Sequence, residues 1–155
     1  MVENEGFHGD LTADWPNVDH LNAAEFLQTA EPDLDLNALA TRVAQRMGNR
    51  ESPSTVLQWL RSLTDERRTK ASYDAIIRTK DPAAMMTAID ALPDSAFKWE
   101  AARIHAKGHV HRDAEATVQW AIDSGSSKIQ DAVAYALPHA NLPVERVAEL
   151  LEKLP

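Results

Sequence analysis

The chain has 155 residues, no cysteine and a formal net charge of −8 at pH 7. This length predicts one domain that buries roughly two-thirds of its unfolded surface. The absence of cysteine excludes a disulfide framework, a thiolate metal site and a cysteine nucleophile. The first residues do not resemble a secretion signal, and no stretch has the length and apolar character of a membrane span. We therefore expect a cytoplasmic protein without a membrane partner.

The acidic residues concentrate at the start of the chain. The first 35 residues hold nine acids and no Lys or Arg, whereas the other 120 hold 15 acids and 16 bases. Residues 1–18 also contain Gly6, Gly9 and Pro16 among acids. We therefore expect an acidic, extended or poorly ordered N-terminal arm over residues 1–18 and a single all-α domain over residues 19–155.

The first predicted helix runs near 21–30, and the second has the clearest amphipathic pattern in the chain. Apolar residues recur at helical spacing over 36–47, and Gly48 stands where a C-terminal glycine is expected. The stripe consists of Leu36, Leu39, Ala40, Val43, Ala44 and Met47. We predict that this helix ends at Met47.

The later helices are predicted from start signals that recur before apolar stripes. Each signal is a Ser, Thr, Asp or Pro residue at a position where it can cap a helix or begin its first turn. Strand signals are missing, because no run alternates apolar and polar residues and no hairpin dipeptide occurs. The start signals are Ser52-Pro53, Thr64, Asp81-Pro82, Asp94 or Ser95, Asp113, Ser126 and Pro143.

These signals together predict an all-α fold of about nine short antiparallel helices, arranged as a helical-repeat stack or as an irregular bundle. A shift of 45 residues superposes Ala91-Leu92-Pro93 on Ala136-Leu137-Pro138, which divides the chain into helix triplets near 20–64, 65–110 and 111–155. This spacing resembles the armadillo and HEAT families, whose repeats stack into a solenoid. The resemblance implies a concave protein-binding surface without enzymatic chemistry.

Three histidines within seven residues form the motif in the sequence that most suggests a metal site. His105, His109 and His111 carry imidazoles, which are zinc ligands, and the first two stand four residues apart on a predicted helix. His109, His111 and Asp113 together resemble the H-x-H-x-D core of metallo-β-lactamase-fold hydrolases. Ala114 stands where that motif has its final His. The segment lacks the general-base Glu of a zincin.

The same segment also fits the end of a helix. Polar and cationic residues near Gly108 can satisfy the last carbonyl groups of one helix, and Asp113 can cap the next. Under this interpretation the protein holds no metal and no cofactor. Zinc bound by His105, His109 and His111 is the alternative.

A basic segment spans residues 61–80, where six Lys and Arg residues outnumber three acids. The arm and this segment carry opposite charge, so we expect possible contact or self-association between them. We do not expect nucleic-acid binding, because the chain is acidic overall and few aromatic residues interleave the bases. The basic residues are Arg61, Arg67, Arg68, Lys70, Arg78 and Lys80.

The four tryptophans are Trp15, Trp59, Trp99 and Trp120. They either fill gaps between helices or face a partner, since Trp is enriched at binding hot spots. The predicted partner-binding residues are Trp15, Trp59, Arg67, Arg68 and Trp99.

No nucleophile elbow, phosphate-binding loop or dinucleotide motif occurs. We therefore predict a protein–protein interaction module rather than an enzyme: an adaptor, an inhibitor or immunity protein, or a subunit of a larger assembly. The alternative is a zinc-binding protein or metal-dependent hydrolase that uses His105, His109 and His111.

Overall fold

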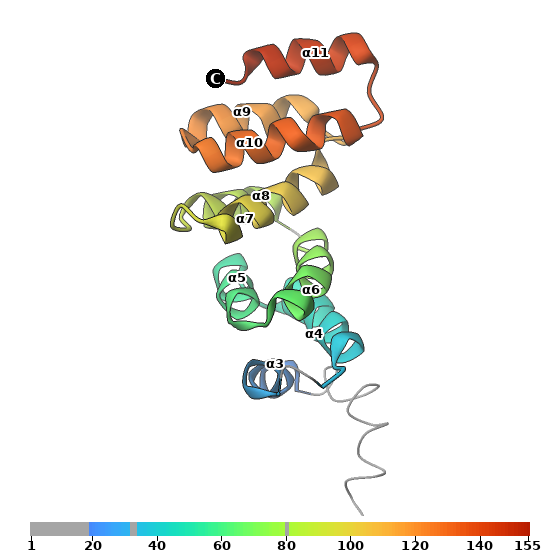
Figure 1. Ribbon diagram of the computed structural model, residues 1–155, viewed down its shortest axis with the longest axis vertical. Coiled ribbons are helices and arrows are strands. Elements are labelled where there is room, and N and C mark those ends of the chain that lie inside the picture. Colours follow the sequence, from blue (N-terminus) through green and yellow to red (C-terminus); the bar gives the residue numbers. More distant parts are fainter. Residues whose placement is uncertain (1–18, 32–33, 80) are drawn as a thin grey trace, which may run out of the picture. The chain divides into compact units, whose positions relative to one another are not determined.

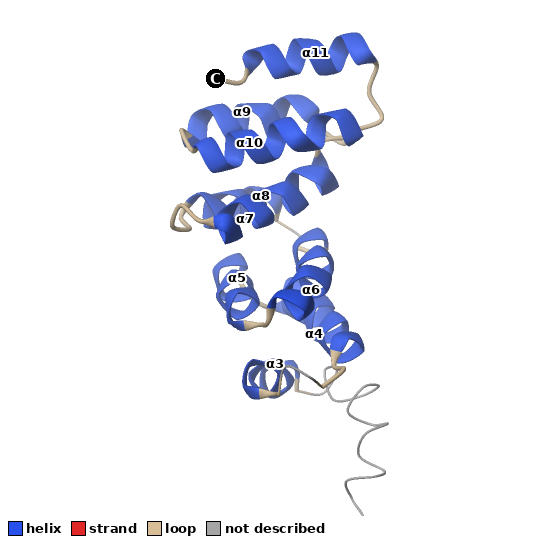
Figure 2. Ribbon diagram, in the orientation of Figure 1, coloured by secondary structure: helices blue, strands red, loops and turns tan. Residues whose placement is uncertain are grey.

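The structure is a computed structural model that describes residues 19–31, 34–79 and 81–155. Over these residues the chain forms nine α-helices and one short 3-10 helix, and no strand (Figure 2). This confirms the predicted all-α class and the number of helices. The predicted arm over residues 1–18 lies outside the described residues, as does Lys80.

The chain divides into two compact units, residues 1–80 and residues 81–155. The single domain expected over residues 19–155 stays a prediction. The N-terminal unit contains α3 (His20–Thr29), α4 (Asn37–Arg50), α5 (Pro53–Ser62) and α6 (Asp65–Ile77) (Figure 1). The C-terminal unit contains α7 (Pro82–Asp90), α8 (Ala96–His109), α9 (Ala114–Ser124), α10 (Ser127–Ala136), the 3-10 helix η1 (Leu137–His139) and α11 (Val144–Lys153).

In the N-terminal unit the most extensive helix contact joins α4 to α6. The two helices run in the same direction, because Asn37 and Glu66 from their first turns line one groove while Gly48 and Ala75 near their last turns approach each other. The intervening helix α5 carries the chain back. Its start was predicted correctly, since the Ser52 side chain accepts a hydrogen bond from the Thr55 N–H.

Gly48 does not end α4, so the prediction of a C-terminal glycine is wrong. The helix continues to Arg50. A Cβ atom at position 48 would overlap the carbonyl oxygen of Ala75 and lie 3.2 Å from its carbonyl carbon. The glycine therefore lets α4 approach the backbone of α6, a requirement that is set by packing rather than by the local end of a helix.

In the C-terminal unit successive helices reverse direction, so that α8 and α10 run the same way with α9 returning between them (Figure 1). The most extensive contact in this unit joins α8 to α10. Gly125 ends α9 in the left-handed conformation, with φ at 65°. The predicted caps of this unit accept hydrogen bonds from backbone N–H groups as expected, and they are Asp81, Ser95, Asp113 and Ser126.

Helices recur in pairs in both units. Each odd-numbered helix from α3 to α9 contacts the helix that follows it, and the pairs begin at residues 20, 53, 82 and 114. The predicted triplet over residues 65–110 spans the division between the units. The resemblance to armadillo and HEAT repeats stays a prediction. In the described part of the chain, no helix combines the length and apolar character that a membrane crossing requires.

Candidate functional site

The candidate site is a groove between α8 and α10. On α8, Trp99, Arg103 and Lys107 follow one another at four-residue intervals and therefore lie on one face of the helix. Tyr135 near the end of α10 and His139 in η1 repeat this spacing. Since the two helices pack side by side in the same direction, these two rows of side chains line opposite walls of the groove.

Aromatic contacts cross the groove. The ring of Trp99 meets that of Tyr135 edge to face, with centroids 5.8 Å apart and planes inclined by 67°. The guanidinium carbon of Arg103 lies 5.5 Å from the centroid of the Trp99 ring, within the range of a cation–π interaction. The Tyr135 and His139 rings are 5.5 Å apart. These contacts hold a cation and an aromatic surface together at the same place.

A cavity of about 100 Å³ lies beside these rings and is lined by Arg103, Lys107, Tyr135, Ala136 and His139. Its volume is enough for a few water molecules or a carboxylate group. The buried methyl side chain of Ala136 leaves this space open between the longer side chains. Half of the Tyr135 side chain remains accessible, at 54 % exposed.

The electrostatics of this cavity favour an anion. Arg103 and Lys107 carry full positive charges, and no acid is among the residues that line the cavity. Glu100 and Asp131 are the acids within α8 and α10, and both lie outside the lining. A carboxylate in this position can accept charge-assisted hydrogen bonds from Arg103 and Lys107 while its carbon chain rests on Tyr135.

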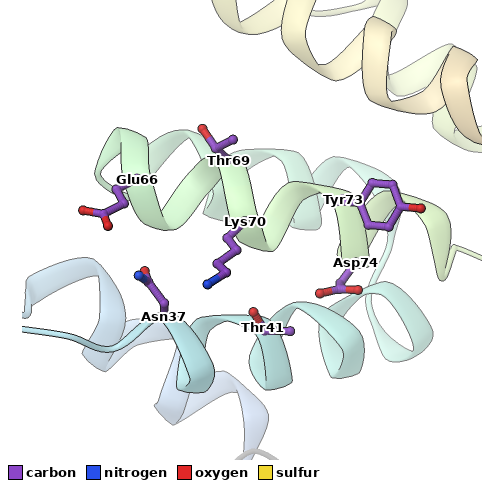
Figure 3. A pocket seen from close by; sticks show the side chains of 7 residues that line it. All are labelled: Asn37, Thr41, Glu66, Thr69, Lys70, Tyr73 and Asp74. Carbon is purple, nitrogen blue, oxygen red and sulfur yellow. The ribbon is translucent and has the colours of Figure 1, made fainter. Parts of the chain in front are cut away.

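A second groove lies in the N-terminal unit, between α4 and α6 (Figure 3). It is open and encloses about 730 Å³. Lys70 points from α6 toward α4, and Glu66 and Asp74 stand one turn before and one turn after it (Figure 3). Two acids and one base therefore give this groove a different charge from the α8/α10 groove. Its lining residues are Asn37, Thr41, Glu66, Thr69, Lys70, Tyr73 and Asp74.

Two of the predicted partner-binding residues are buried in the N-terminal unit. Trp59 is 3 % exposed, and its indole N–H donates to the carbonyl oxygen of Ala24 at 3.1 Å. Arg67 is 2 % exposed. Each therefore stabilises the packing of α3. Trp59 fills a gap between helices, which is one of the two roles considered for the tryptophans above.

Arg67 binds the end of α3. Its guanidinium donates to the carbonyl oxygens of Leu27 and Leu34, each at 3.2 Å, and to that of Glu31. A cation at the C-terminal end of a helix satisfies free carbonyl groups and interacts favourably with the helix dipole. Lys98 does the same in the C-terminal unit, where its ammonium donates to the carbonyl oxygens of Asp90 and Leu92 at 3.0 and 3.1 Å.

The remaining predicted contact residues have different surroundings. Arg68 forms an ion pair with Asp65 at 2.9 Å. Trp99 lies in the α8/α10 groove. Trp15 lies outside the described residues. The structure thus places Trp99 in the candidate site and buries Trp59 and Arg67 within the N-terminal unit.

The histidine motif divides between core and surface. His105 is 1 % exposed, and neither of its ring nitrogens has a hydrogen-bond partner. Its ring lies 4.4 Å from that of His109 and meets Trp120 edge to face at 5.4 Å. Burial, reinforced by the charge of His109, lowers the pKa of His105 to about 3. His105 is therefore a neutral core residue at pH 7.

His109 and His111 occupy the end of α8 and the turn that follows. The pKa of His109 is lowered by partial burial and then by the charges of Arg112 and His111. The predicted helix-start role of Asp113 is confirmed, since its side chain accepts from the Ala116 N–H at 3.0 Å. Within the described ranges no three metal-ligating side chains come together. The zinc alternative stays a prediction.

Sequence reasoning missed Arg103, Lys107, Tyr135 and His139. The four-residue spacing of Trp99, Arg103 and Lys107 was a readable signal for one exposed face. The second wall was not readable, because nothing in the local sequence places α10 beside α8.

Comparison of the chain with protein-family models, with curated proteins and with solved structures finds no match. Its function is therefore inferred from the geometry of the grooves.

Proposed function

We propose that this protein is a non-enzymatic protein-interaction module that binds an acidic segment of a partner protein in the α8/α10 groove. The observation that carries this proposal is the cavity between Arg103, Lys107 and Tyr135, which has two cations on its α8 wall and no acidic lining residue. Trp99 extends the same surface through its contacts with Arg103 and Tyr135. Arg, Trp and Tyr are the residues most enriched at binding hot spots.

Two properties favour a carboxylate-bearing protein segment over nucleic acid. The cavity of about 100 Å³ suits a carboxylate group, which is much smaller than a nucleotide. The net charge of −8 also disfavours a long polyanion, whose binding depends on neutralising many phosphates at once. A short acidic segment needs only the local pair of cations.

The recurrence of helix pairs supports a helical-repeat interpretation, in which the groove between two parallel helices of successive pairs serves as the binding surface. A module of this kind fits an adaptor, an inhibitor or a subunit of a larger assembly. We place its action in the cytoplasm, as the sequence predicts.

The proposal is tested by fluorescence anisotropy with a labelled twelve-residue peptide that alternates Glu and Ala. Charge reversal by Arg103→Glu together with Lys107→Glu is expected to weaken binding at least tenfold, or about 1.4 kcal/mol. The matched control is Arg61→Glu with Arg78→Glu, which changes the net charge equally at two exposed positions of the N-terminal unit. This control is expected to retain the affinity within about twofold, because neither Arg61 nor Arg78 lines the cavity.

Equal weakening by both double variants would show that the peptide senses only net charge and would overturn the proposed groove. A twelve-residue oligothymidine is the second ligand. Tighter binding of this oligonucleotide than of the peptide, lost in the α8/α10 variant, would replace the acidic protein partner by a nucleic acid.

A further inference from the structure

The α6 wall of the α4/α6 groove carries a row of three charges (Figure 3). Glu66, Lys70 and Asp74 follow one another at four-residue intervals, in the order negative, positive, negative. Unlike charges at this spacing can pair along a helix. Among the described residues, however, none of these three side chains forms an ion pair or a hydrogen bond. These three residues, the α6 charge row, are therefore available to the charges of a ligand.

The α4 wall of the same groove is polar and uncharged. It consists of Asn37 and Thr41, whose side chains have no hydrogen-bond partner in the part of the chain that the structure describes. An Asn amide and a Thr hydroxyl can each donate and accept. An extended chain offers backbone N–H and C=O groups to such partners, whereas a helix pairs most of its own. The α4 wall therefore favours an extended ligand over a helical one.

The spacing of the α6 charge row matches that of an extended chain. Its charges follow one another at about 6 Å, the rise of four helical residues. In an extended chain every second side chain points to the same side, at intervals of about 6.6 Å. Over three charges the two spacings differ by about 1 Å in total. An extended segment of five residues can therefore place three charges opposite the row, and the groove of about 730 Å³ has the size of a ligand pocket.

From this match we propose that the α4/α6 groove is a second interaction surface, which binds an extended segment of a partner protein with the charge pattern Lys-Xaa-Glu-Xaa-Lys. Each charge of the segment meets an unlike charge of the row, and the α4 wall hydrogen-bonds its backbone. The pattern reads the same in both directions, so either orientation of the segment suits the groove. The proposal does not depend on the α8/α10 groove, which selects net negative charge, because the α4/α6 groove selects the order of charges.

The test is an NMR titration of the isotope-enriched full-length protein with the capped peptide Thr-Lys-Thr-Glu-Thr-Lys-Thr, in which threonine favours the extended form. We expect saturable shifts of the amide signals of residues 37–41 and 66–74. The comparison peptide, Thr-Lys-Thr-Lys-Thr-Glu-Thr, has the same composition and net charge. It is expected to bind about fivefold more weakly or less, because two of its charges meet like charges in either orientation.

Inversion of the α6 charge row provides the matching protein variant. Glu66→Lys, Lys70→Glu and Asp74→Lys together are expected to weaken binding of the first peptide at least fivefold and to create binding of Thr-Glu-Thr-Lys-Thr-Glu-Thr. Unchanged amide shifts in α3 and α5 would show that the N-terminal unit remains folded. The control Glu25→Lys makes the same change in net charge outside the groove, and it is expected to retain the affinity within about twofold.

Equal affinity for the two isomeric peptides, or shifts only outside residues 37–41 and 66–74, would overturn the proposal. Tighter binding of a stapled helical peptide, with Lys, Glu and Lys at four-residue spacing, would replace the extended segment by a helix. Groove signals that shift with protein concentration alone would assign the groove to a second copy. Titration with the Glu-Ala peptide reports separately on residues 99–107, so this proposal and the proposed function can fail independently.

Discussion

The α4/α6 and α8/α10 pairs share one backbone arrangement and carry two different surface chemistries. In each unit a pair of parallel helices makes the most extensive contact, and one intervening helix returns the chain from the end of the first to the start of the second. The α4/α6 groove presents Glu66 and Asp74 around Lys70, whereas the α8/α10 groove presents Arg103 and Lys107. Buried positions thus set the packing of a helix pair, and exposed positions at four-residue spacing set the ligand that its groove suits.

The two units also differ in how they satisfy buried polar groups. Arg67 in the N-terminal unit and Lys98 in the C-terminal unit each donate to carbonyl groups that follow a helix. Only the C-terminal unit, among described residues, also buries a histidine whose ring nitrogens have no hydrogen-bond partner. The units should therefore respond differently to loss of a buried cation and to acid.

The largest expected effect follows from removing the cation at the end of α3. Arg67→Met is expected to lower the free energy of unfolding of the N-terminal unit by about 4 kcal/mol, because three carbonyl groups each lose a charged donor. Lys98→Met, which removes the donor of two carbonyl groups, is expected to cost about 2 kcal/mol. Urea denaturation with native-state hydrogen exchange measures each unit separately. A larger cost for Lys98→Met would contradict this comparison.

Acid is expected to destabilise the C-terminal unit selectively. The pKa of His105 is about 3 in the folded chain, below its ordinary value of 6.5, so the unfolded chain binds more protons between these values. The contribution of neutral His105 to stability is therefore present above pH 6.5 and is lost progressively as the pH falls toward 3. Between pH 7 and pH 5 we expect a loss of about 2 kcal/mol.

Hydrogen exchange at pH 7 and pH 5 measures this loss in each unit. His105→Leu is the control, because it keeps an apolar side chain of similar size and removes the titrating group. This variant is expected to abolish most of the difference between the two pH values. An equal loss in the N-terminal unit would show that His105 is not its cause.

The close approach of α4 to α6 predicts a smaller effect. Gly48→Ala is expected to lower the free energy of unfolding by about 1.5 kcal/mol, since overlap with the Ala75 carbonyl outweighs the gain in helix propensity of about 1 kcal/mol. Asn49→Ala, at the exposed neighbouring position of the same helix, is expected to be neutral or slightly stabilising. Stabilisation by Gly48→Ala, measured by urea denaturation, would mean that the helices separate at little cost.

The smallest expected effect concerns the wall of the α8/α10 groove. A double-mutant cycle with Trp99→Leu and Arg103→Leu is expected to give a coupling energy of about 0.5 kcal/mol, the usual size of a cation–π contact near the surface. Thermal unfolding of the four proteins measures this coupling. Strict additivity would show that Arg103 is not held against Trp99, and the groove would lose part of its preorganisation.

The sequence predicted helices well because their start signals are local. Ser52, Asp81 and Ser126 each accept hydrogen bonds from N–H groups three residues later, so a few residues contain the whole interaction. Gly48 shows the limit of such signals, since its position near the end of an apolar stripe has a cause on another helix.

The candidate site was predicted less completely because exposure depends on distant contacts. A tryptophan and an arginine have the same sequence signature in a core and on a surface, so Trp59 and Arg67 could not be distinguished from Trp99 and Arg103. Trp59 and Arg67 donate to carbonyl oxygens that lie 35 and 40 residues away in the sequence. Only the three-dimensional arrangement shows which cations already have partners.

The bond from Arg67 to Leu27 also constrains the order of folding. It closes a separation of 40 residues, so α3 gains this interaction only after α6 has formed and approached it. Closing such a loop costs chain entropy before any contact offsets it, whereas α4, α5 and α6 meet over shorter separations. We therefore expect α3 to dock after α4, α5 and α6, which would make α3 the one of these four helices that opens most readily in the native protein.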